Sequence, residues 1–152
     1  MRVDFYQLGA APVEQVLASI AQKLLAQGER LLVVGADALQ LARLDRTLWD
    51  QGPASFLPHA IAGESEDSRQ PILLSTTLDA ANLARNLLLP DGTWREAATG
   101  FDRTFYLFDS ESVEAARGAW RSLARHDEVE RHYWAQVDGR WVEKASDSRG
   151  AA

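Results

Sequence analysis

The residues of this chain best suited to acid–base or metal chemistry are its three histidines, His59, His126 and His132, and its clustered carboxylates. The chain contains no cysteine, so a zinc site would need the histidines to converge with a carboxylate, and their spacing gives little support for that. Glu64 and Glu66 lie in a polar stretch typical of solvated acids. His59 follows a proline and is interpreted as a hydrogen-bonded structural residue in a loop. We therefore expect no catalytic residue, no metal and no cofactor.

A second candidate for chemistry is Gly35, which lies between an apolar run and a predicted helix start. A glycine at such a junction can let an anion approach a helix N-terminus. The chain has no G-x-G-x-x-G or G-x-x-x-x-G-K-[ST] phosphate motif and no G-x-S-x-G nucleophile motif. Gly35 is therefore interpreted as a turn residue, and a degenerate nucleotide-binding enzyme is kept as the alternative function.

The first candidate for binding is an aromatic pair, Trp49 and Phe56, around the end of a predicted helix, with Pro53 and Pro58 stiffening the connection. Trp49 lies about 100° around the helix from Leu48, which belongs to the buried stripe, so at least part of its ring is expected to face outward. Large rings on a rigid segment bury much area at low entropic cost. The spacing leaves two interpretations open: an interface anchor, or two rings that cap the core.

The second candidate for binding is a row of arginines, Arg117, Arg121 and Arg125, which recur every four residues on a predicted helix beside Trp120. Guanidinium groups next to an aromatic ring suit the capture of an acidic or C-terminal peptide. Arginines late in a helix also offset its dipole and pair with a carboxylate such as Glu114. Both interpretations stay open at this point.

The composition of the chain limits what these residues can do. Its 152 residues are 46% apolar and 25% charged, which predicts one packed globular domain. Sixteen Lys and Arg against 22 Asp and Glu give a formal charge of -6, so direct binding of nucleic acid is disfavoured and any such contact is expected to be indirect. The N-terminal residues show no signal peptide or membrane span, so we expect a cytoplasmic protein that makes no membrane contact.

Alternating apolar runs and helical periodicity predict an α/β domain whose right-handed crossovers place helices against a sheet. Asp37 and Gln40 form a capping-box pattern at one helix start. Asp138-Gly139 predicts a C-terminal hairpin and hence a mixed sheet. We expect one domain over 1–144 and a flexible tail over 145–152. We expect strands at 3–8, 30–34, 72–74, 87–89 and 104–108, and helices at 13–28, 37–50, 94–101 and 111–126.

Several segments taken together resemble a known family. They are Arg43-Leu44-Asp45 with Leu48-Trp49, Ser55-Phe56-Leu57-Pro58-His59 with Gly63-Glu64, Gln70-Pro71-Ile72-Leu73-Leu74-Ser75, and Phe101-Asp102-Arg103. In this order they are similar to the chi subunits of bacterial DNA polymerase III holoenzyme. The resemblance runs from the first strand to the helix that carries the arginine row.

The resemblance implies a Rossmann-like α/β domain, with helices on both faces of a mostly parallel or mixed sheet and without nucleotide chemistry. With this fold, the alternative function is a degenerate Rossmann-like nucleotide-binding enzyme. Chi subunits are non-catalytic accessory proteins in DNA replication. They pair with the psi subunit, which ties them to the clamp loader, and they bind the C-terminal tail of single-stranded DNA-binding protein.

The resemblance also implies roles for particular residues. Val113 stands where some relatives carry a lysine, which implies a thinner basic pocket for the tail. The residues implied in binding psi are Trp49, Phe56, Leu57 and Pro58. The residues implied in binding the tail are Arg117, Trp120, Arg121 and Tyr106.

Overall fold

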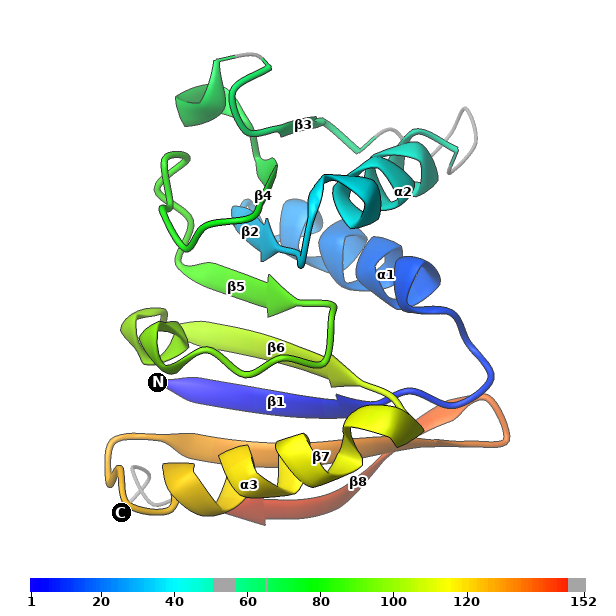
Figure 1. The fold of residues 1–152 in the computed structure, drawn as a ribbon, viewed down its shortest axis with the longest axis vertical. Helices are drawn as coiled ribbons and strands as arrows, with labels where there is room; N and C mark the ends of the chain where they lie inside the picture. The colour runs from blue at the N-terminus through cyan, green and yellow to red at the C-terminus, as the bar shows by residue number, and fades with distance from the viewer. Residues whose placement is uncertain (51–56, 65, 148–152) are drawn as a thin grey trace.

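The computed structural model describes residues 1–50, 57–64 and 66–147. Phe56 and the end of the expected tail lie outside the described residues. Within them, eight strands form one sheet in the order β3-β4-β2-β5-β6-β1-β7-β8 (Figure 1). Their bounds are β1 Arg2–Gln7, β2 Leu31–Val34, β3 His59–Ile61, β4 Ile72–Ser75, β5 Asn86–Leu89, β6 Arg103–Phe108, β7 Glu130–Val137 and β8 Arg140–Asp147.

The sheet is mixed, as the sequence predicts. β7 and β8 pair antiparallel, whereas the other neighbouring strands described here pair parallel. Asp138 and Gly139 have φ angles of 53° and 78°, which is the two-residue hairpin turn expected of an Asp-Gly pair.

Helices cover both faces of the sheet, which confirms the predicted fold class. The side chains of α1 and α2 pack with one face, where Leu17, Leu44 and Leu74 are buried together. The side chains of α3 pack with the other face, in a cluster with Phe5 and Phe108. The helices are α1 Val13–Ala26, α2 Ala38–Trp49 and α3 Val113–Leu123, with short 3-10 turns η1 Asp67–Arg69, η2 Glu96–Gly100 and η3 Ser110–Ser112.

The central strands explain the continuous apolar runs. Every residue of β2, β4 and β5 is buried, as expected of parallel strands that have a layer on each face. Among the described residues, no helix has both the length and the apolar character that a membrane crossing requires.

Three local predictions need correction. The expected helix at 94–101 is only a 3-10 turn at Glu96–Gly100. β3, a strand of three residues beside β4, was not predicted. β8 extends to Asp147, which pairs in register with Arg131 and forms an ion pair with it. Residues 145–147 therefore belong to the sheet and not to the expected tail.

Candidate protein-interaction surfaces

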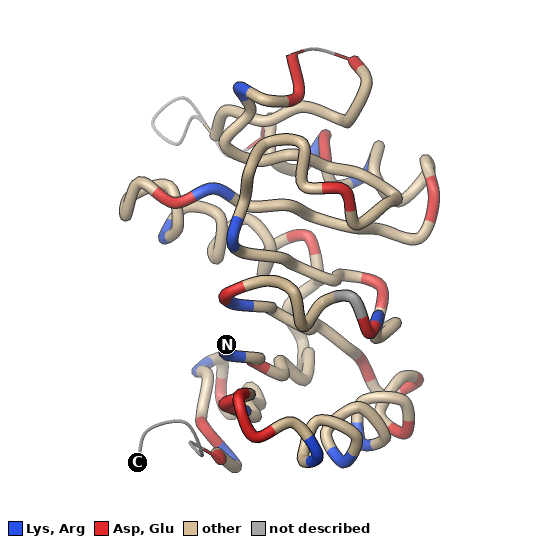
Figure 2. The backbone as a smooth tube through the Cα atoms, turned by 90° about the vertical axis from the view of Figure 1, so that its left-hand side faces the viewer, with Lys and Arg blue, Asp and Glu red and all other residues tan. Residues whose placement is uncertain are grey.

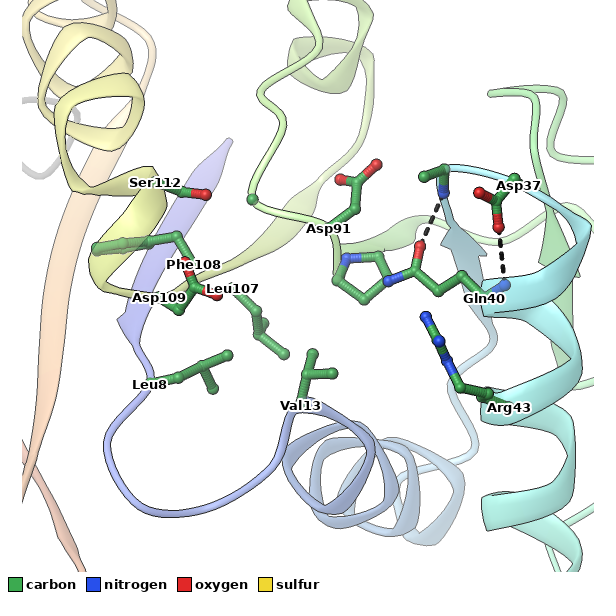
Figure 3. Close-up of a pocket in the computed structure, with 13 residues that line it drawn as sticks. Leu8, Val13, Asp37, Gln40, Arg43, Asp91, Leu107, Phe108, Asp109 and Ser112 are labelled. Carbon is green, nitrogen blue, oxygen red and sulfur yellow. Dashed lines mark hydrogen bonds between the residues drawn. The ribbon is translucent and has the colours of Figure 1, made fainter.

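A pocket of about 300 Å³ opens at the carboxyl ends of β2, β5 and β6, the usual place for a nucleotide in an α/β fold (Figure 3). Asp37, Asp91, Asp109 and Arg43 line it. Asp37 and Asp109 accept hydrogen bonds from the helical turns that begin beside them, and Asp91 pairs with Arg95. Three carboxylates beside one arginine give the pocket acidic walls, which is the wrong charge for phosphate.

The backbone amides at the start of α2 also have partners within the chain. The Ala36 amide donates to Gln40 Oε1 at 2.8 Å, and the Gln40 amide donates to Asp37 Oδ1 at 2.9 Å. The predicted cap at Asp37 is confirmed, although the Gln40 side chain reaches Ala36 instead of the Asp37 amide. A Cβ atom at Gly35 would lie 2.8 Å from Gln40 Oε1, so a side chain here would displace the Gln40 side chain that holds the Ala36 amide. The nucleotide-binding alternative gains no support here.

All three histidines contact nearby carboxylates, His59 through Asp45. His126 Nδ1 lies 3.3 Å from Glu128 Oε1. His132 contacts Glu130 on its own strand and Glu143 on β8. Among the residues described by the structure, no group of three or more His, Asp or Glu side chains is arranged to hold a metal ion. His126 directly follows Arg125 at the end of the arginine row, and His132 lies on β7.

The first candidate surface lies at the C-terminal end of α2. Leu44 and Leu48 face the sheet and are buried, whereas the side chain of Trp49, the last residue of the helix, is 56% exposed. The predicted outward orientation of at least part of Trp49 is therefore confirmed, whereas Phe56, the other ring of the pair, lies outside the described residues. Pro58 is half-buried, but Leu57 is only 4% exposed and packs in the core, so its side chain offers a partner almost no surface.

His59 connects this surface to the sheet. Its Nδ1 lies 2.7 Å from the Leu57 carbonyl oxygen, and its Nε2 lies 2.9 Å from Asp45 Oδ1 on α2. The centre of its ring is 4.7 Å from that of Trp49. The prediction of a hydrogen-bonded structural histidine is confirmed, although His59 begins β3 and does not lie in a loop.

The second candidate surface is the outer face of α3. Arg117 and Arg121 are exposed on this helix, and Figure 2 shows the Lys and Arg positions along it. The expected helix over 111–126 is shorter than predicted, because α3 ends at Leu123, and exposed Arg125 lies in the turn that follows. Arg117 Nη1 lies 2.9 Å from Glu114 Oε1, and the side chain of Arg117 is 60% exposed. The Glu114 pair suggested by spacing is therefore present, and it is exposed enough for a partner carboxylate to compete with it.

Trp120 is half-buried beside this arginine row, and three contacts hold its ring in place. The ring packs edge-on against Phe5 at a centroid distance of 5.2 Å and against Tyr133 at 6.1 Å. The guanidinium carbon of Arg131 lies 4.3 Å from the ring centroid, and Arg131 Nη1 donates to the Trp120 carbonyl oxygen at 2.6 Å. Arg131 could not be predicted from the sequence, because its role depends on a contact between β7 and α3.

Tyr106 does not belong to the second surface, and its predicted role is corrected here. Its side chain is fully buried between the sheet and α3, where it packs against Phe5 and Phe108. Its hydroxyl donates to the Gly92 carbonyl oxygen at 2.6 Å, and burial raises the pKa of Tyr106 to about 12. A residue in this position supports the core and cannot contact a partner.

The two surfaces are well separated. Trp49 lies on the face of the sheet that α1 and α2 cover, whereas Arg117 and Trp120 lie on the face that α3 covers. Figure 1 shows α2 toward the top of the molecule and α3 toward the bottom. The two candidate surfaces therefore do not overlap.

Comparison with known proteins gives one consistent result. The family model for "DNA polymerase III chi subunit, HolC" matches residues 1–130. A protein of Escherichia coli strain K12 named DNA polymerase III subunit chi is 28% identical over 117 residues, which cover 75% of this chain and 80% of the relative. Proteins of the same name from Pseudomonas aeruginosa and Haemophilus influenzae are 30% identical over 100 residues and 31% identical over 77 residues. These cover 56% and 51% of this chain, and 70% and 53% of the relatives.

Proposed function

This chain belongs to the family of DNA polymerase III chi subunits, and we propose that it acts as a non-catalytic link between two protein partners during DNA replication. One partner is the psi subunit, through which the chain joins the clamp loader. The other is the C-terminal tail of single-stranded DNA-binding protein. The chain works in the cytoplasm and reaches nucleic acid only through these proteins.

The observation that carries this proposal is the row of exposed arginines beside a braced tryptophan on a chain of formal charge -6. An acidic protein is a poor ligand for bare DNA. The carboxylates of an acidic peptide can instead pair with Arg117 and Arg121, and its apolar terminal side chain can pack near Trp120. Charge-assisted bonds at an exposed site give modest affinity that falls with salt. Modest affinity suits a contact that must be made and released repeatedly.

The psi subunit is assigned to the surface around Trp49. An exposed tryptophan is a frequent anchor of a protein interface, because it buries a large area and has few rotatable bonds. Half-buried Pro58 extends this surface along the chain. Phe56, which lies outside the described residues, stays part of the proposal, whereas Leu57 contributes by packing in the core.

The assignment of the tail is tested with Arg117→Ala. We expect roughly five-fold or greater loss of affinity for a tail peptide, measured by titration calorimetry, and unchanged binding of psi. Arg69→Ala is the matched control, because Arg69 forms an exposed pair with Glu66 at the same i,i+3 spacing and the same 2.9 Å distance as the pair of Arg117 with Glu114. Equal binding of the peptide by the Arg117 variant would remove this residue from the site.

The assignment of psi is tested with a double change, Trp49→Ala and Phe56→Ala. We expect psi binding to be lost in gel filtration while the far-ultraviolet circular dichroism and melting temperature stay close to those of the unmodified chain. The exposure of Trp49 is the reason that the fold should survive. An unfolded variant would show instead that these rings stabilise the core.

A further inference from the structure

The side chain of His59 lies where α2, β3 and the segment before β3 meet. The residue is buried, and its two ring nitrogens each have a partner: the Leu57 carbonyl oxygen at 2.7 Å and Asp45 Oδ1 at 2.9 Å. Both partners lie close in sequence to residues of the proposed psi surface. A single imidazole therefore joins the parts of the chain that carry that surface.

These two contacts fix the ring in both position and rotation. The Leu57 carbonyl oxygen and the Asp45 carboxylate oxygen are both hydrogen-bond acceptors, and one lies at each ring nitrogen. The Asp45 side chain is 31% exposed, whereas the histidine side chain is fully enclosed. The carboxylate thus shields one edge of the ring from water, and the ring cannot turn without losing a hydrogen bond.

The fixed ring in turn supports Trp49. The two ring centroids are 4.7 Å apart and the planes are inclined at 54°. Asp45 and Trp49 are four residues apart on α2, so they share one side of the helix and the imidazole contacts both. On its other side, the hydrogen bond to Leu57 holds the backbone that leads into Pro58.

We infer that Asp45 and His59 are positioning residues of the partner-binding surface, which orient Trp49 and the Leu57–Pro58 backbone before a partner arrives. This inference rests on the proposed assignment of psi to that surface. The physical advantage is preorganisation: an exposed tryptophan that is already held in its bound orientation loses less conformational freedom on binding. Neither residue needs to touch the partner.

The inference is tested with His59→Gln in the full-length chain, titrated with purified psi subunit. We expect about ten-fold weaker binding, because Trp49 would then have to be ordered when the partner binds. His126→Gln is the matched control, because His126 also pairs with a carboxylate but lies after α3, and it should bind psi as the unmodified chain does. Unchanged affinity of the His59 variant would overturn the inference.

A double-mutant cycle separates positioning from general stability. In a chain that carries Trp49→Leu, His59→Gln should cause a clearly smaller loss of affinity, because only the Leu57–Pro58 backbone is left for it to position. The same loss in both backgrounds would show that His59 acts on the whole fold, and the inference would be wrong. Asp45→Ala is the second variant if the histidine change prevents folding, and the same cycle applies to it.

A readout without psi keeps this inference separate from the proposed function. Trp49 fluorescence is obtained as the difference between the chain and its Trp49→Leu variant. We expect Asp45→Ala to change that emission, whereas an unchanged spectrum would contradict the positioning role. If the unmodified chain does not bind psi at all, the proposed function fails, and the emission result still decides whether Asp45 and His59 orient the ring.

Discussion

Replacing Asp4 with asparagine is expected to destabilise the fold far more than the same change at an exposed aspartate. Asp4 lies in the centre of β1, its side chain is fully buried, and β1 pairs with β6 and β7 on its two sides. Arg2 and Arg103 each donate to its carboxylate at 2.9 Å, and Trp134 Nε1 donates at 3.0 Å. Asp4→Asn keeps the shape but removes the charge that these donors share.

The magnitude follows from the exposure of the partners. Removing one member of a buried ion pair costs about 3–5 kcal/mol, mostly because the other charge is left buried and unpaired. The side chains of Arg2 and Arg103 are each 34% exposed, so both keep part of their hydration. The lower end of the range, about 3 kcal/mol, is therefore expected. For a domain of this size that corresponds to a fall of roughly 6–12 °C in melting temperature.

The assay is urea unfolding followed by tryptophan fluorescence, with calorimetry for the melting temperature. The midpoint should fall and the slope should stay the same, because the surface exposed on unfolding is unchanged. Asp102→Asn is the control: Asp102 is exposed and lies 3.8 Å from exposed Arg85, so its loss should cost no more than about 0.5 kcal/mol. The reasoning is refuted if the two variants are equally stable.

Two further predictions concern titration and the arginine row. Burial raises the pKa of Tyr6 and of Tyr106 to about 12. An unfolded tyrosine titrates near pH ~10, so the neutral hydroxyls contribute stability that is complete below pH ~10 and is lost as the pH rises toward the folded pKa values. Tyrosinate absorbance should therefore appear together with loss of native circular dichroism. Ionisation of these tyrosines near pH ~10 in a chain that is still native would contradict this prediction. Glu114→Gln should raise affinity for a tail peptide by about 1.5- to 5-fold, because the exposed pair that Arg117 must give up is worth only about 0.2–1 kcal/mol; weaker binding would show that Glu114 helps to hold the peptide.

The fold class could be predicted from the sequence because its signals are local. The apolar runs at 31–34 and 72–74 are buried strands, and the helical periodicity that starts at Val13 gives α1. The cap at Asp37 and the turn at Gly139 depend only on neighbouring residues. Such features need no knowledge of which strands lie side by side.

The order of strands in the sheet could not be predicted, and the error at Tyr106 follows from that. β6 lies inside the sheet, between β5 and β1. The side chain of Tyr106 is on the face of the sheet that α3 covers and is buried there. The sequence of β6 does not show which side chains face solvent, because every residue after Arg103 in this strand is buried. The resemblance to chi subunits supplied the residue but not its surroundings.

The binding candidates were predicted in part. Residue type and helical spacing selected Trp49 and Arg117, but only the packing of α2 shows that the ring of Trp49 is turned out of the core. His59 was predicted to be structural but not to support Trp49, and Arg131 was not predicted at all, because each acts through a contact with another element of the fold. Spacing within one helix cannot reveal a brace that comes from a neighbouring strand.

The most direct test of the two-surface account is a binding experiment with both partners present. Purified chain is titrated with labelled psi subunit in the absence and presence of a saturating peptide that has the sequence of the single-stranded DNA-binding protein tail. The account predicts a ternary complex in which each dissociation constant changes by less than about two-fold. Competition between psi and the peptide, or binding of bare single-stranded DNA in place of the peptide, would contradict it.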